Sequence, residues 1–105
     1  MEVIHLNKES FEKLTTQPGK SVLVDFWVSW CGPCMKLTAE LEELAARHPE
    51  IIVGKINIEE ADNTQLAVSL GVNSIPALFF YRDGKLADQL VGYMKAAELE
   101  KKLGI

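Results

Sequence analysis

Long hydrophobic runs, a basic excess and a cysteine framework are all missing from this chain of 105 residues. No apolar stretch approaches the ~18 residues of a membrane helix. The N-terminal segment also lacks the basic region and apolar stretch of a signal peptide. Lysine and arginine number 11 against 15 acidic residues, which argues against nucleic-acid binding. We therefore expect no membrane and no nucleic acid among its partners, and we predict a cytoplasmic protein.

The composition is that of a folded protein. Hydrophobic residues make up 48% and charged residues 25% of the sequence, which argues against intrinsic disorder. A chain of this length buries roughly 60–70% of the surface that its unfolded form exposes, and this suffices for one core. No internal repeat, low-complexity segment or linker divides the sequence, so we predict a single domain over residues 1–105.

Apolar runs alternate with segments of helical periodicity. Asp83-Gly84 is a hairpin signal, and Asn7 and Asp62 are candidate helix caps. We expect strands over 3–6, 21–28, 51–58, 77–81 and 86–91, and helices over 7–18, 34–49, 62–71 and about 96–103. These elements predict an α/β fold, a mixed sheet of about five strands flanked by four helices.

The two cysteines, Cys31 and Cys34, stand between a predicted buried strand and an amphipathic helix. A bridge between them closes a very short loop and contributes only roughly 2 kcal/mol in the chain-entropy model, so fold stabilisation explains the pair poorly. A helix N-terminus stabilises a thiolate, so Cys31 should be nucleophilic near neutral pH. Cys34 falls on the apolar stripe of Leu37 and Leu41, so we expect Cys31 to be exposed and Cys34 more buried.

Thiol–disulfide exchange suits this arrangement. The thiolate of Cys31 attacks a disulfide, and Cys34 then attacks the sulfur of Cys31 and releases the reduced partner. Three alternatives stay open: a zinc half-site completed by His5 and His48, two accidental buried cysteines, and a structural bridge. The two histidines form no closely spaced pair, so redox chemistry is favoured. We expect no metal and no bound cofactor, because the electrons reside on the two sulfurs.

Asp25 lies inside a predicted strand between Leu23 and Trp27 on the same face, where aspartate is rare. Burial favours the neutral carboxyl, so its pKa should be raised towards physiological pH. We infer that it sits beneath the cysteines and carries a proton to or from Cys34. The alternative is a capping or salt-bridged aspartate at an exposed edge. Lys55 is either its charge partner on a neighbouring strand or a solvated strand residue.

Ile75-Pro76 precedes a predicted strand, and proline there is ordinarily trans. Trp30, just before the first cysteine, is either an exposed contact residue or part of the core.

Taken together, these residues resemble the thioredoxin family. The segment Asp25-Phe26-Trp27-Val28-Ser29-Trp30-Cys31-Gly32-Pro33-Cys34 is similar to the family's active site almost position by position. Lys55-Ile56-Asn57-Ile58, Ser74-Ile75-Pro76, Asp83-Gly84 and Val91-Gly92 follow in the family's order. The resemblance runs from about residue 3 to residue 103, and it implies the thioredoxin fold.

The resemblance also implies roles for the site residues. Cys31 would attack and Cys34 resolve, as a redox-active disulfide, with Asp25 and Lys55 as the buried pair that tunes them. The bond before Pro76 would be cis and face the disulfide. A flat apolar docking surface would be bordered by Trp30, Gly32, Pro33, Ile75 and Gly92, and the backbone near Ser74 and Ile75 would pair with extended substrate.

Four positions depart from the family's pattern. Met35 stands where a basic residue is usual, with Lys36 one place later, and Ala39 replaces a proline that commonly kinks the helix. Tyr93 replaces a small residue beside the docking surface, and Asn73 stands where a basic residue is frequent. We expect a straighter helix at Ala39, and effects of the other changes on partner choice and potential.

The predicted function is reduction of disulfides in protein substrates, in electron transport and cell redox homeostasis. We expect a monomer that is recharged by a thioredoxin reductase. The Gly-Pro pair between the cysteines resembles the reducing members of the family. Two rivals are an oxidant or isomerase on the same fold, and a binding module that uses the apolar face without redox chemistry.

Overall fold

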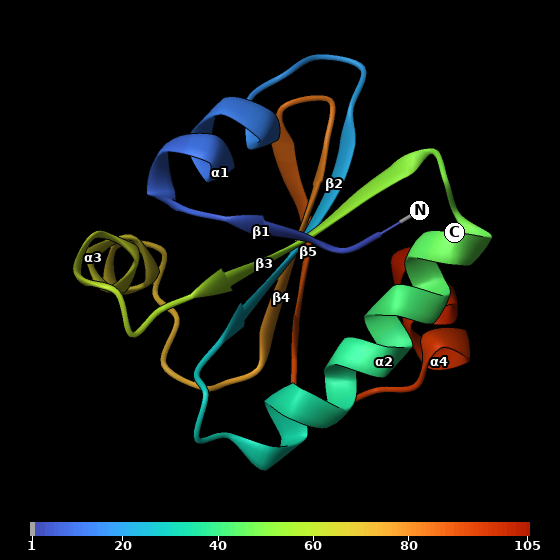
Figure 1. Cartoon of the computed structure of the whole chain (residues 1–105). Coiled ribbons are helices and arrows are strands. Elements are labelled where there is room, and N and C mark those ends of the chain that lie inside the picture. The colour runs from blue at the N-terminus through green and yellow to red at the C-terminus, as the bar shows by residue number, and fades with distance from the viewer. Residues whose placement is uncertain (1) are drawn as a thin grey trace.

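The chain forms one five-stranded sheet with helices on both of its faces (Figure 1). The computed structural model describes residues 2–105. Along the chain the elements are β1 (Ile4–Leu6), α1 (Lys8–Thr15), β2 (Ser21–Trp27), α2 (Gly32–Arg47), β3 (Ile51–Asn57), α3 (Ala61–Ser69), β4 (Ala77–Arg82), β5 (Lys85–Val91) and α4 (Ala96–Leu103). The predicted α/β class and its nine elements are confirmed, with most strand ends within about one residue of the expected ones.

The strands lie side by side in the order β1-β3-β2-β4-β5, so β2 is central. β1, β3 and β2 are parallel, as expected where helices connect strands, while β4 and β5 are antiparallel additions. The β4–β5 turn is made by Asp83 (φ 56°) and Gly84 (φ 80°), the left-handed pair that a tight hairpin needs. The mixed sheet and the hairpin are therefore confirmed.

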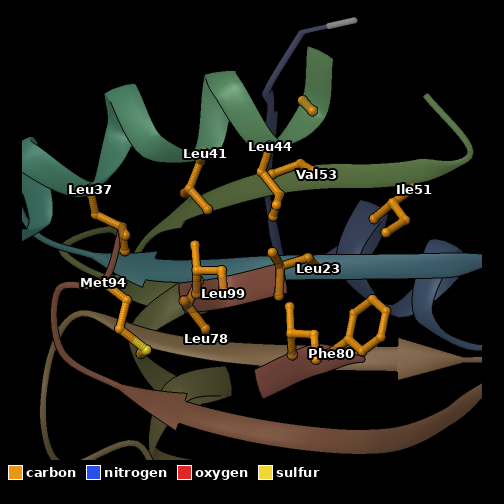
Figure 2. Close-up of a cluster of buried hydrophobic side chains, with 12 residues drawn as sticks. Leu23, Leu37, Leu41, Leu44, Ile51, Val53, Leu78, Phe80, Met94 and Leu99 are labelled. Carbon is orange, nitrogen blue, oxygen red and sulfur yellow. The ribbon is translucent and has the colours of Figure 1, made fainter. Parts of the chain in front are cut away.

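Two apolar layers hold the helices to the sheet. On one face α2 and α4 cover a cluster in which Leu37, Leu41 and Leu44 of α2 point onto the strands (Figure 2). On the other face α1 and α3 cover a second cluster, where Phe11 and Phe26 meet edge to face at 5.8 Å. Burial of both strand faces explains the nearly continuous apolar runs of β2 and β3.

The helix caps test the sequence prediction residue by residue. Asn7 caps α1 as expected, and its side chain accepts from the backbone N of Ser10 at 2.8 Å. The prediction that Asp62 caps α3 is wrong, because the N-cap is Glu60 and Asp62 lies in the first turn. The backbone N of Thr64 donates to the carbonyl of Glu60 at 2.8 Å, so the first helical hydrogen bond closes two residues earlier than expected.

Candidate functional site

The cysteine pair lies at the junction between the end of β2 and the first turn of α2. Cys31 is the N-cap of α2, and Pro33 occupies the first turn, where its missing N–H is not needed. A disulfide joins Cys31 to Cys34, with their Cα atoms 5.3 Å apart. The Sγ of Cys31 also accepts from the backbone N of Cys34 at 3.2 Å. The Sγ of Cys31 therefore lies at the positive end of the helix dipole.

Cys34 is buried as predicted, whereas Cys31 is more enclosed than the sequence suggests. Cys31 is 8% exposed and Cys34 is fully buried, so the prediction that Cys31 is exposed is wrong, although it is the more open of the two. The pair packs with Val28 in a small apolar cluster, and Ile75 lies against it. Ile75 comes from a loop some forty residues away in sequence, which is why the apolar pattern around the cysteines did not reveal this cover.

Asp25 is buried in the centre of the sheet, as predicted, and it is fully inaccessible to solvent. It shares a strand face with Leu23, which packs beneath α2, so its carboxyl lies on the sheet face that α2 covers; Cys34 is one of the buried residues of that helix. Within residues 2–105, neither carboxyl oxygen has a hydrogen-bond partner. Burial raises the pKa of Asp25 from 3.8 to about 7, and the charge of Lys55 opposes that rise. The exposed-edge alternative is therefore wrong.

Lys55 stands opposite Asp25 in the β2–β3 register and is 5% exposed, so it is not a solvated strand residue. Its ammonium donates to the hydroxyl of Thr38 on α2 at 2.6 Å and lies 4.5 Å from the centre of the Trp27 ring. Lysine and aspartate thus face each other across adjacent strands without a direct salt bridge among the described residues. Thr38 was not singled out by the sequence, because only the fold brings it over β3.

The loop before β4 lies beside the disulfide. The Ile75–Pro76 bond is cis, as the resemblance implied, and the carbonyl of Pro76 accepts from Gly92 N at 2.8 Å. This bond ties the loop to the chain after β5. Ile75 is partly buried and Ser74 is exposed. In the part of the chain that the structure describes, no hydrogen bond joins the backbone of these two residues to another backbone group.

Large apolar side chains stand out around this site. Trp30 is 76% exposed, so it belongs to the surface and not to the core. Gly32 and Pro33 are exposed at the start of α2, and Met35 is 47% exposed one residue after Cys34. Tyr93 is 40% exposed and directly follows Gly92, whose backbone N donates to Pro76.

Two further positions lie in the interior and at the far end of α2. The helix continues without a break through Ala39, which occupies the place of the proline that commonly kinks it. His48 caps the other end of α2 and bonds to Glu100 of α4 at 2.6 Å, so it lies far along the helix from the cysteines. No group of three or more histidine, cysteine, aspartate or glutamate side chains suited to a metal occurs in residues 2–105.

One contact near the cysteines was missed by the sequence analysis. The backbone N of Ser29 donates to Glu59 Oε1 at 2.7 Å, and the Ser29 hydroxyl donates to Glu59 Oε2 at 3.0 Å. Ser29 belongs to the segment that leads from β2 to Cys31, and Glu59 to the turn after β3. The parallel pairing of β2 and β3 brings their carboxyl ends together. A predicted parallel pairing of these two strands was the only indication in the sequence that Ser29 and Glu59 lie close to each other.

Comparison with known proteins gives consistent results. A family model described as Thioredoxin matches residues 2–104. "Thioredoxin" of Chlorobaculum thiosulfatiphilum is 38% identical over 96 residues, covering 90% of this chain and 87% of that protein. "Thioredoxin 2" of Chlorobaculum tepidum is 40% identical over 96 residues, covering 90% and 86%. The chloroplastic M-type thioredoxin of Pisum sativum is 36% identical over 103 residues, covering 97% of this chain and 59% of its own.

A solved structure gives the same fold. It comes from work on the thiol resolving mechanism of a yeast mitochondrial 1-Cys peroxiredoxin via glutathione and thioredoxin systems. The TM-score is 0.84 at 24% identity, and the match covers 97% of this chain and 93% of that one. None of the helices found over residues 2–105 has both the length and the apolar character to cross a membrane.

Proposed function

The chain belongs to the thioredoxin family and is a protein-disulfide reductase, and on that premise we propose how its residues divide the reaction. Cys31 is the attacking thiol, Cys34 the resolving thiol, and Asp25 the group that takes up and returns the proton of Cys34. The observation that carries this proposal is the Cys31–Cys34 disulfide at the N-terminus of α2, together with the buried carboxyl of Asp25 on the sheet face below, which has no hydrogen-bond partner within residues 2–105.

In the first step, the Cys31 thiolate attacks one sulfur of a substrate disulfide. A mixed disulfide forms at Cys31, the substrate S–S bond breaks, and the departing substrate sulfur takes a proton from solvent. The N-cap position supports this step, because the Cys34 backbone N–H and the helix dipole both stabilise negative charge on Cys31 Sγ.

In the second step, Cys34 loses its proton and attacks Cys31 Sγ. The mixed disulfide breaks, the Cys31–Cys34 bond forms, and the substrate leaves with its second sulfur as a thiol. Two electrons have then moved from the protein to the substrate. Asp25 suits the role of proton acceptor because its pKa, about 7, lies near physiological pH. Lys55 keeps that value from rising further by favouring the carboxylate.

The substrate docks on the surface bordered by Trp30, Gly32, Pro33, Ile75 and Gly92. The exposure of Trp30 supports an apolar contact, and the free backbone of Ser74 and Ile75 supports pairing with an extended segment of substrate. We assign the protein to the cytoplasm as a monomer, with a thioredoxin reductase as the partner that returns two electrons to the disulfide.

Reduction of insulin by dithiothreitol, followed as turbidity, tests the division of roles. Cys31→Ser should abolish the protein's contribution and form no mixed disulfide. Cys34→Ser should instead trap a covalent complex with substrate through Cys31, visible on a non-reducing gel. If Cys34 carried the trapped substrate in Cys31→Ser, the two roles would be reversed.

A redox titration distinguishes the reductase from an oxidant or isomerase on the same fold. Trp30 adjoins the disulfide and Trp27 lies close by in sequence, so tryptophan fluorescence should report the two-electron transition in graded thiol–disulfide buffers. A strongly reducing midpoint supports the reductase, whereas a midpoint close to that of oxidants would contradict it.

A further inference from the structure

The contact between Ser29 and Glu59 is not used by the reaction just described. Ser29 is exposed, and it sits in the four-residue stretch between the end of β2 and the start of α2, which has no regular structure. Inside that stretch the Cys31 backbone N donates to Val28 O at 3.3 Å, a long bond. The two bonds from Ser29 to the Glu59 carboxylate, at 2.7 and 3.0 Å, are shorter.

Glu59 is itself held firmly in its turn. Its backbone N donates to Asn57 Oδ1 at 2.9 Å, and the backbone N of the neighbouring Ile58 donates to Trp27 O at 3.0 Å. Asn63, only 2% exposed, donates to the Asn57 carbonyl at 2.9 Å. The carboxylate is thus presented from a turn that is hydrogen-bonded to both β2 and α3.

We propose that Glu59 is a positioning residue of the disulfide exchange. It accepts two hydrogen bonds from Ser29 and so fixes the segment that carries Trp30 and Cys31. The inference rests on the proposed role of Cys31 as the attacking thiol. A fixed segment keeps Cys31 Sγ within reach of the Cys34 backbone N–H and keeps Trp30 at the rim of the docking surface. Both conditions favour attack on a protein disulfide, because they orient the nucleophile and the substrate before the reaction.

The charge state of Glu59 agrees with this role. The hydrogen bonds from Ser29, first from its backbone and then from its hydroxyl, hold the pKa of Glu59 below its usual range. The carboxylate is therefore ionised across the working pH range, and its bonds to Ser29 are of the stronger, charge-assisted kind.

Three variants and one control test the proposal: Glu59→Gln, Ser29→Ala, the double variant, and Glu60→Gln. Glu60→Gln removes the same charge from the next residue, whose side chain makes no cap hydrogen bond. Two measurements are made on each reduced, folded protein. The first is kcat/KM for insulin reduction, and the second is the pH at which Cys31 becomes reactive towards iodoacetamide.

We expect Glu59→Gln to lower kcat/KM by about threefold to tenfold, the range expected for loss of a charge-assisted contact. Ser29→Ala, which keeps the backbone N–H bond, should give a smaller loss in the same direction. The double variant should be no worse than Glu59→Gln, because both changes break one contact. The reactivity of Cys31 should move to higher pH in both single variants and stay unchanged in Glu60→Gln.

Three results would overturn the proposal. The first is activity of Glu59→Gln within the error of the parent protein. The second is that Cys31 becomes reactive at lower pH in Glu59→Gln but at an unchanged pH in Ser29→Ala. That pattern would arise from the loss of the Glu59 charge alone and not from the loss of its contact with Ser29. The third is an equal loss in Glu60→Gln. If Cys31→Ser kept its activity, the assignment of the attacking thiol would fall instead, whatever Glu59 does.

Discussion

Replacing Asp25 with asparagine should make the oxidised protein more stable, by an amount that grows with pH. The exchange keeps the size of the side chain and removes its charge at a position with no solvent access and no hydrogen-bond partner for either oxygen among the described residues. An ionised carboxylate at such a place costs free energy, and the neutral amide avoids that cost.

The pKa of Asp25 gives the size of the effect. A rise from 3.8 to about 7 is equivalent to roughly 4 kcal/mol, at about 1.4 kcal/mol for each pH unit. Between these two values the folded protein binds more protons than the unfolded chain, so its stability falls as pH rises through this window. The full cost is present above about pH 7. This figure already includes the charge of Lys55, which lowers the pKa of Asp25 against the larger effect of burial.

Urea denaturation of both proteins at several pH values between 4 and 8.5 measures this difference. We expect similar stabilities near pH 4 and a gain of about 2–4 kcal/mol for Asp25→Asn above pH 8. Asp62→Asn, the same exchange at an exposed position, is the control and should change stability by less than about 1 kcal/mol with little pH dependence. A gain in Asp25→Asn that did not vary with pH would refute the reasoning, because Asp25 would then titrate alike in both states.

Other expectations can be checked with the same methods. Lys55→Met should raise the pKa of Asp25 further, because it removes the charge that opposes the effect of burial; a fall, seen by carboxyl NMR titration, would contradict this. The hydrogen bond to Glu100 raises the pKa of His48 above 6.5, so its stabilisation is complete below that pH and is lost as pH rises through the folded-state pKa. Glu100→Gln should return the imidazole titration towards 6.5, and an unmoved titration would show that the bond does not form in solution. Leu41→Ala, in the buried layer beneath α2, should cost about 3 kcal/mol in urea unfolding, and a loss under about 1 kcal/mol would mean that the cavity collapses.

The elements of the fold could be predicted because each carries a local signal. These signals depend on neighbours within a few residues: they are the apolar runs of β2 and β3, the apolar stripe of Leu37 and Leu41, and the Asn7 cap. Asp25 could also be found, since a carboxylate inside an apolar strand contradicts its surroundings. The prediction for Asp62 was wrong because the sequence is compatible with a helix that starts after Asp62 and with one that starts after Glu60. The hydrogen bond from Thr64 N to the Glu60 carbonyl shows that α3 starts after Glu60.

The features that the sequence could not supply all join distant segments. Thr38 accepts a hydrogen bond from Lys55, and Glu59 accepts two from Ser29. Ile75 packs against the cysteines, which the family resemblance implied but the local apolar pattern did not. Each contact depends on the register of two strands or on how a helix lies across the sheet. Side-chain periodicity says which face a residue occupies but not which residue of another element it meets there.

Because Cys31 Sγ accepts the Cys34 backbone N–H, one amide proton is a built-in reporter of the oxidation state. In the oxidised protein the acceptor is a neutral disulfide sulfur, and after reduction it is a thiolate, which binds the same proton more strongly. The Cys34 amide resonance should therefore move downfield on reduction, and its exchange with deuterium should slow. In an isotope-labelled sample, this one resonance would measure the fractions of reduced and oxidised protein in a mixture with partner proteins, without any added dye.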